Sequence, residues 1–244
     1  MQPFIDIKNV KKSYGNKVVH DGINLEIRKG EVLTLMGGSG SGKSVLLRSL
    51  IGLEKPDSGK ILFGEVDIAG LEDEQLVEIR KRIAYCFQYG ALFDSMTVKE
   101  NLAYPLREHT DMGEKAIHAK VLETLEKVGL KGNERLFPQD LSGGMQRRVG
   151  VARSIIMNPE VILYDEPTTG LDPYNTEQIL KIILQNKKLG CTSVLVTHDM
   201  HSIFTITDRI AFLKNGKIYA LGTREEIKNS KDPEVYGFIH GELP

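Results

Sequence analysis

Residues 37–44 read Gly37-Gly38-Ser39-Gly40-Ser41-Gly42-Lys43-Ser44 and directly follow the apolar run Val32–Met36. The octapeptide matches G-x-x-x-x-G-K-[ST], a loop whose glycines let successive backbone N–H groups point at phosphate. A strand before the loop and helical spacing after it are the context that this pattern requires. We expect Lys43 to neutralise the β- and γ-phosphates and the Ser44 hydroxyl to coordinate Mg²⁺. The stretch predicts a nucleotide site in an α/β domain rather than a plain glycine-rich turn.

Two more apolar runs have the length of buried strands. Val161–Tyr164 and Ser193–Thr197, like Val32–Met36, are short and end in small or polar residues. Such runs are typical of parallel strands covered on both faces, and open α/β sheets bind ligands beyond the carboxyl ends of their strands. We therefore expect one parallel sheet with a ligand site at that edge.

Helical spacing of apolar residues follows Lys43 and recurs at Ile117–Val128 and Met145–Met157. Between Tyr89 and Asn158 no convincing strand pair is present. We expect a single domain over residues 4–244, with an α-helical subdomain inserted at about residues 89–158.

Hairpins are predicted on either side of this core. The first thirty residues read as strands, and Asp21-Gly22 lies between Val18-Val19 and the alternating residues from Ile23 onward. Asn215-Gly216 gives the same signal, because both central positions of such a turn need a positive φ.

Composition limits the class of protein. The chain has 244 residues and a formal net charge of −1, so no overall field favours nucleic acid. Cys86 and Cys191 form no metal or disulfide pattern and fit a reducing compartment. No apolar run reaches the ~18 residues of a membrane span, and we expect no signal peptide. If the protein serves transport, another chain has to form the pore.

The run Val161–Tyr164 ends in two carboxylates, Asp165 and Glu166. With the phosphate loop present, we expect Asp165 to face the metal and Glu166 to polarise the attacking water. Without that loop, a strand leaving the core into a solvated turn would be the better interpretation.

Ser142-Gly143-Gly144 precedes a helix and has the character of a second anion cradle. One bound nucleotide does not need two cradles in one chain, and a simple kinase or GTPase has no use for the second. A plain helix cap by Ser142 explains the residues equally well when they are considered alone.

In this region the chain resembles the ABC ATPase family, whose signature motif usually reads LSGGQ. The residues that carry the resemblance are, in chain order, Tyr14 with Val19 at the adenine-stacking position, Gln88 in the Q-loop, Leu141–Arg148 in the signature motif, Thr169–Asp172 in the D-loop and His198 at the switch position. Each has a plain structural explanation alone, and their joint order and spacing identify the family from about Phe4 to Leu221.

The resemblance implies an α/β fold: a P-loop NTPase (RecA-like) core with an antiparallel β subdomain and an inserted α-helical subdomain. It implies the cofactors ATP and Mg²⁺. The expected ATP-binding residues are Tyr14, Val19 and Gly38–Val45, the catalytic residues are Glu166, His198, Lys43 and Gln88, and the metal site is formed by Ser44, Gln88 and Asp165. Val45 replaces the commoner Thr, which removes one hydroxyl contact to the α-phosphate.

Family members form head-to-tail homodimers, so the resemblance implies that Ser142, Gly143, Gly144 and Asp172 act in trans on the neighbour's ATP. It also implies integral membrane permease subunits as partners. Tyr89–Leu106 would contact the permease, and Ala91, Leu92, Phe93, Met96 and Val98 would line the groove. Internal packing of these apolar residues is the alternative.

One subgroup is especially similar. Gly90–Val98, Glu100-Asn101, Ala103–Thr110, Met145 and the short tail from Asp232 resemble the ATPases of Mla-type phospholipid transporters. This implies lipid trafficking between inner and outer membranes, a lipid-binding substrate protein as a further partner, and a peripheral location at the cytoplasmic face of the inner membrane.

Three alternatives stay open. The chain could serve another importer or exporter of the family. A soluble ABC ATPase acting on ribosomes or DNA is disfavoured, because those usually carry two cassettes or a long coiled coil. A kinase or a regulator without turnover is disfavoured by the signature loop together with Glu166 and His198. We expect no nucleic acid partner.

Overall fold

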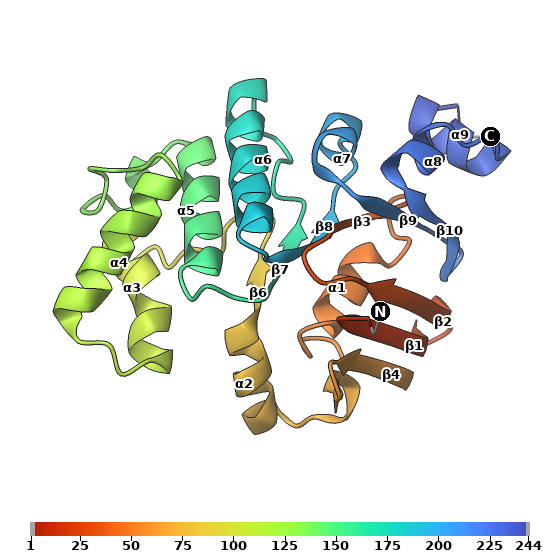
Figure 1. Cartoon of the computed structure of the whole chain (residues 1–244), viewed down its shortest axis with the longest axis horizontal. Coiled ribbons are helices and arrows are strands. Elements are labelled where there is room, and N and C mark those ends of the chain that lie inside the picture. Colours follow the sequence, from red (N-terminus) through yellow and green to blue (C-terminus); the bar gives the residue numbers. More distant parts are fainter. Residues whose placement is uncertain (1–2, 243–244) are drawn as a thin grey trace.

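A six-stranded sheet runs through the middle of the protein, whose computed structural model describes residues 3–242 (Figure 1). The strand order is β10 (Lys217–Thr223), β9 (Arg209–Lys214), β3 (Val32–Met36), β8 (Thr192–Val196), β7 (Val161–Asp165), β6 (Ile83–Cys86). Neighbouring strands are parallel except β9 and β10. The three predicted buried strands are β3, β7 and β8, although β8 begins and ends one residue earlier than expected. The edge strand β6 was missed because it is short.

The central sheet is covered on both faces, as its continuous apolar strands require. Successive side chains of a strand point to opposite faces. Ile162 and Tyr164 of β7 pack with α5 (Gly143–Ile155) and α6 (Pro173–Lys188). Val161 and Leu163 pack with α1 (Lys43–Ser49) and the antiparallel sheet. Two further helices beside the sheet are α2 (Asp73–Arg82) and α7 (Met200–Ile206).

A second, antiparallel sheet has the order β2 (Lys17–Ile27), β1 (Ile5–Tyr14), β4 (Ser58–Phe63), β5 (Val66–Asp67), and η1 (Ile68–Gly70) follows it. The predicted turn at Asp21-Gly22 is wrong: these residues lie inside β2, and the chain turns between Tyr14 and Lys17. Gly22 has φ +78° at a shift in the β1–β2 register, so its positive φ serves a bulge rather than a turn. The Asn215-Gly216 turn between β9 and β10 is confirmed, with φ of 50° and 72°.

The predicted helices between Tyr89 and Asn158 stand together at one end of the molecule (left in Figure 1). They are α3 (Val98–His109), α4 (Glu114–Lys127), η2 (Pro138–Asp140) and α5 (Gly143–Ile155). A capping box of Thr97 and Glu100 starts α3. These helices share one apolar core with α6, so the helical subdomain and the central sheet are packed continuously.

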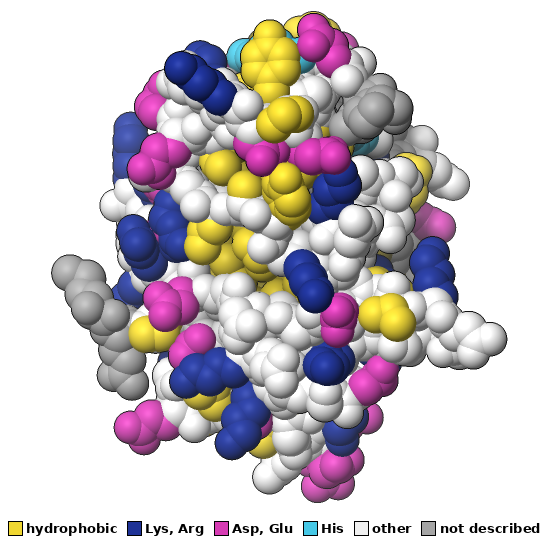
Figure 2. Space-filling view, turned by 90° about the vertical axis from the view of Figure 1, so that its right-hand side faces the viewer, with side chains coloured by type: hydrophobic (Ala, Val, Ile, Leu, Met, Phe, Trp, Pro, Cys, Tyr) yellow, Lys and Arg dark blue, Asp and Glu magenta, His cyan; other side chains and the backbone are white. Residues whose placement is uncertain are grey.

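The chain finishes with α8 (Arg224–Lys228) and α9 (Pro233–His240), which pack on Phe212 of β9 through a separate small core. The predicted domain runs to residue 244, but residues 243 and 244 lie outside the described residues. Figure 2 shows one end of the molecule, where basic and acidic side chains are interspersed. Across residues 3–242, no helix combines the length and apolarity needed to cross a membrane.

Candidate nucleotide site

A cavity of about 620 Å³ opens at the carboxyl end of β3. It is lined by Tyr14, Lys17, Val19, Gly37, Ser39, Gly40, Gly42, Lys43, Ser44, Val45, Gln88, Glu166 and His198. The structure thus brings together most of the residues predicted to bind ATP within one chain. The other two loop residues, Gly38 and Ser41, are joined by a backbone hydrogen bond of 3.2 Å. Lys17 was not predicted, because a lone lysine in a strand gives no signal.

The side chain of Lys43 is bound by the backbone of its own phosphate loop. Lys43 Nζ donates to the carbonyl oxygens of Gly37 and Gly38 at 2.8 and 2.9 Å. Burial lowers the pKa of Lys43, and the negative charges of Glu166 and Asp165 act in the opposite direction. Both acceptors are neutral carbonyl oxygens, and a charged phosphate oxygen is a stronger acceptor than either.

His20 supports the loop from β2 and was also missed. Its Nε2 lies 3.0 Å from the carbonyl oxygen of Gly42, and the ring is fully buried. Gly42 has φ +98°, and a Cβ there would lie 2.8 Å from the His20 ring and from Val19. Only glycine fits this position. The antiparallel sheet therefore sets the curvature of the phosphate loop.

Both oxygens of Asp165 are held. Oδ1 accepts from Ser44 Oγ at 2.8 Å, and Oδ2 accepts from the Tyr85 hydroxyl at 2.7 Å. Burial, reinforced by Asp165, raises the pKa of Tyr85, so its hydroxyl stays a donor. A hydroxyl, a carboxylate and the Gln88 amide form an oxygen donor set that fits Mg²⁺, which takes one or two carboxylates and completes its shell with water and phosphate. Tyr85 was not predicted, since its role depends on β6 lying beside β7.

Glu166 stands at the start of a tight turn after β7. Its φ is +53°, an unfavourable conformation for a non-glycine residue, and its backbone N–H donates to Val196 at 2.8 Å. Oε2 accepts from the Thr169 hydroxyl at 2.5 Å and lies 2.7 Å from His198 Nδ1. The carboxylate and the imidazole, far apart in sequence, therefore meet at the cavity.

Tyr14 lies at the outer end of the cavity and is 47% exposed. Lys12 Nζ is 5.1 Å from its ring centre, while Val19 is buried beneath the loop. An exposed aromatic face beside a phosphate loop is able to stack on a base.

Gln88 lines the cavity, and the segment after it leads to the surface. Arg153 of α5 donates to the carbonyl oxygens of Gly90 and Ala91 at 3.0 and 2.7 Å. Tyr89 is 76% exposed and Phe93 is 43% exposed. Of the predicted groove residues, Ala91 and Phe93 are exposed, and Leu92 and Met96 are partly buried. Val98 is fully buried in the helical core, so its expected place in the groove is wrong.

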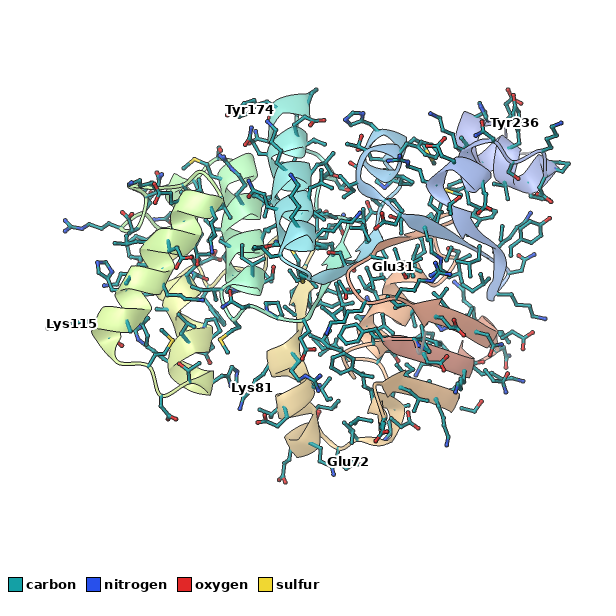
Figure 3. All side chains as sticks on the ribbon, viewed as in Figure 1. Glu31, Glu72, Lys81, Lys115, Tyr174 and Tyr236 are labelled. Carbon is teal, nitrogen blue, oxygen red and sulfur yellow. The ribbon has the colours of Figure 1, made fainter. Side chains whose placement is uncertain are left out.

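The predicted trans residues lie together, outside the cavity lining. Ser142 caps α5, and Gly144 lies so close to Asn175 that a Cβ would meet that side chain at 2.3 Å. Asp172 caps α6 and accepts from the Asn175 backbone N–H at 2.9 Å. Tyr174 projects beside them at the end of α6 (Figure 3). The signature loop and the D-loop therefore form one surface made by the first turns of two helices.

Comparisons with known proteins agree with this geometry. The sequence profile described as "ABC transporter" matches residues 20–169. The intermembrane phospholipid transport system ATP-binding protein MlaF of Haemophilus influenzae is 41% identical over 99% of this chain and 92% of its own length. The probable ribonucleotide transport ATP-binding protein mkl of Mycobacterium leprae is also 41% identical, over 97% of this chain and 69% of its own length.

Among solved structures, the ATP-binding cassette MJ0796, a dimer in a post-hydrolysis state bound to ADP and Pi, is similar with a TM-score of 0.84 and 34% identity. The match covers 90% of this chain and 98% of that one. Sequence and fold lead to the same conclusion: this protein belongs to the ABC transporter family, as an ABC ATPase subunit homologous to MlaF.

Proposed function

We propose that this ABC ATPase powers phospholipid transport between the inner and outer membranes through a separate permease. The observation that carries the proposal is the presence on one chain of a nucleotide cavity with a carboxylate at its edge and a second anion cradle, Ser142–Gly144, outside it. A chain that served one nucleotide alone would have no use for the second cradle.

The chemistry we propose is hydrolysis by a water that Glu166 orients. Thr169 and His198 engage Oε2, which leaves Oε1 available to that water. Lys43 would leave the loop carbonyls for the β- and γ-phosphates, and Ser44, Asp165 and Gln88 would hold Mg²⁺. Bound Mg²⁺ would neutralise charge on the phosphates. Because hydrolysis removes the γ-phosphate, it would remove the contacts that this phosphate bridges between two subunits, and the dimer would open.

The working unit we propose is a head-to-tail homodimer. The paired helix ends that present Ser142–Gly144 and Asp172 would cover the ATP held by the partner's phosphate loop, since helix N-termini favour anions. Two ATP molecules would then lie in the interface and close it. The dimeric state of MJ0796 with ADP and Pi supports this arrangement.

The permease partner would dock on the surface that follows Gln88. Tyr89, Phe93 and Tyr104 are exposed there, and Phe93 and Tyr104 stack edge to face at 5.2 Å. Exposed aromatic residues are enriched at protein interfaces. We therefore propose a peripheral location at the cytoplasmic face of the inner membrane, and from the similarity to MlaF we propose a lipid-binding substrate protein as a further partner of the assembly.

The phospholipid substrate is supported by the similarity to MlaF over nearly the whole length of both chains. The equally similar mkl, named for probable ribonucleotide transport, supplies the competing candidate. The test is to purify the complex with its permease and identify small molecules released from the wild type and from Glu166→Gln. Phospholipid retained by the complex and moved between vesicles only with hydrolysable ATP is the expected result. Ribonucleotide in its place would overturn the lipid assignment and leave the ATPase assignment standing.

A further inference from the structure

Arg147 lies in the second turn of α5 and does not line the nucleotide cavity. It links this helix to the turn that contains Thr169 and to the loop that contains Tyr89. Its Nη2 donates to the carbonyl oxygen of Thr169 at 3.0 Å. Its guanidinium carbon lies 4.8 Å from the ring centre of Tyr89. Nη1 is buried and has no hydrogen-bond partner in the part of the chain that the structure describes. The guanidinium is thus held by a hydrogen bond through Nη2, and Nη1 is able to donate a further one.

The contact with Thr169 leads to the catalytic carboxylate. The backbone of Thr169 is held by Arg147, and its hydroxyl donates to Glu166 Oε2 at 2.5 Å. The turn also contains the unfavourable φ of Glu166, +53°, which persists only if neighbouring groups support it. Arg147 is therefore part of what fixes the orientation of Glu166.

The contact with Tyr89 leads to the surface. The loop after Gln88 is docked firmly on α5, because Arg153 binds its carbonyls and a Cβ on Gly150 would lie 2.6 Å from Gly90 Cα. Tyr89 is therefore held in place beside Arg147 while most of its ring is exposed to solvent. A partner that covers this ring acts on the guanidinium beneath it.

We propose that Arg147 is a positioning residue for Glu166, which transmits occupancy of the Tyr89 surface to the catalytic turn through Thr169. The occupant of the Tyr89 surface is the part of the membrane permease that docks after Gln88, so this inference rests on the proposed function. A cation–π contact strengthens when solvent is removed from it. Docking on Tyr89 therefore tightens the stack, orders Arg147 and with it the turn from Glu166 to Thr169.

The chemistry of arginine suits this task better than that of lysine. A planar guanidinium can stack on a ring with its face while its edge donates to a carbonyl, whereas an ammonium has no such plane. Arg147→Lys therefore keeps the charge and loses the arrangement. Arg135→Gln is the matched control, since it removes the same charge from an exposed side chain that precedes α5 and does not line the cavity.

The first experiment measures ATP affinity without Mg²⁺, KM and kcat for the full chain, alone and assembled with its permease. Arg147→Gln and Arg147→Lys are expected to lower kcat about tenfold with ATP affinity within about twofold of wild type, whereas Arg135→Gln keeps wild-type kcat. Arg147→Gln combined with Thr169→Val should be no slower than the slower single variant, because both break one path. Unchanged kcat for Arg147→Gln, parallel loss of ATP affinity, or additive losses would overturn the inference.

The second experiment measures how far the permease stimulates hydrolysis. Tyr89→Leu should bring the stimulation to about one, and Tyr89→Phe, which keeps the ring, should retain it. In an Arg147→Gln background the two Tyr89 variants should not differ. Equal stimulation of Tyr89→Leu and wild type would overturn the inference. If the wild-type chain hydrolysed no ATP, either alone or assembled with its permease, the proposed function would be overturned as well. The wild type therefore distinguishes failure of this inference from failure of the proposed function.

Discussion

Replacing Tyr85 by Phe should raise the Mg²⁺ concentration that the ATPase needs, while leaving metal-free ATP binding unchanged. The Tyr85 hydroxyl donates to Asp165 Oδ2 at 2.7 Å, whereas the other oxygen of that carboxylate faces Ser44. Phe fills the same space and keeps the contact with Phe87, whose ring centre is 4.5 Å away. The substitution therefore removes one hydrogen bond and little else.

The expected size of the effect follows from that bond. A hydrogen bond to a charged group is worth about 1.5–3 kcal/mol. This hydrogen bond is present both with and without the metal. Only the part of its free energy that orients Asp165 for the metal therefore contributes to the Mg²⁺ affinity. Loss of a residue that orients a metal ligand typically costs ~10- to 100-fold in affinity. Because phosphate and water supply most ligands of Mg²⁺, the lower value, about tenfold, is expected here.

The assay is ATP hydrolysis at fixed ATP over a range of Mg²⁺ concentrations, with calorimetry of ATP binding in a chelator as the second readout. Tyr164→Phe is the control: this residue precedes Asp165 on β7, and its buried hydroxyl has no partner in the described chain. A Tyr85→Phe enzyme with the wild-type Mg²⁺ requirement would refute the reasoning. So would an equal shift in both variants, which would indicate loss of packing.

Four further changes test other parts of the site. Lys43→Ala should weaken ATP binding at least about tenfold in calorimetry, because a charged contact to phosphate is lost. Ser142→Arg should block turnover and ATP-dependent dimerisation in light scattering, while the monomer still binds ATP. Tyr14→Ala should weaken ATP binding about tenfold and reduce the preference for ATP over GTP in a competition assay. Burial lowers the pKa of His20, so the free energy of unfolding should fall as pH drops below about 6.5, and His20→Gln should flatten that slope in urea titrations at pH 7.5 and 5.5.

The parts of the fold that the sequence predicts well are those with a strong local cause. The strand β3 and the loop after it are decided by a continuous apolar run and by glycines, of which Gly37 and Gly42 leave no room for a Cβ. The turn at Asn215-Gly216 was predicted because both of its central positions need a positive φ, which Asn and Gly adopt readily. Asp21-Gly22 carries an equal local signal, yet pairing of β2 with β1 continues past it. There tertiary pairing decides between a bulge and a turn, and the local sequence does not.

The residues missed in the site share a different cause. Tyr85 and His20 belong to no motif, Arg147 was placed in the signature motif without a role for its side chain, and each acts on a segment far away in the chain. Tyr85 reaches Asp165 only because β6 pairs in parallel with β7. Val98 was misplaced because an apolar residue at a helix start fits a groove and a core equally well, and burial in the helical core decides it. Contacts between distant elements, not residue types, determine these positions.

In the proposed dimer, α5 would couple the binding of one nucleotide to the hydrolysis of the other. The start of α5 presents Ser142 and Gly143 outward, with Gly144 buried behind them, and the next turn carries Arg147, which holds the turn of the same chain's Glu166. A helix is stiff over two turns, so a shift that brings its N-terminus to a phosphate also moves the guanidinium. If the cradle serves the partner's ATP, each subunit adjusts its own carboxylate as it grips the other's nucleotide. An Arg147→Gln dimer should therefore still close on two ATP molecules while its two sites lose their cooperativity, which is measured as a Hill coefficient for ATP falling towards one.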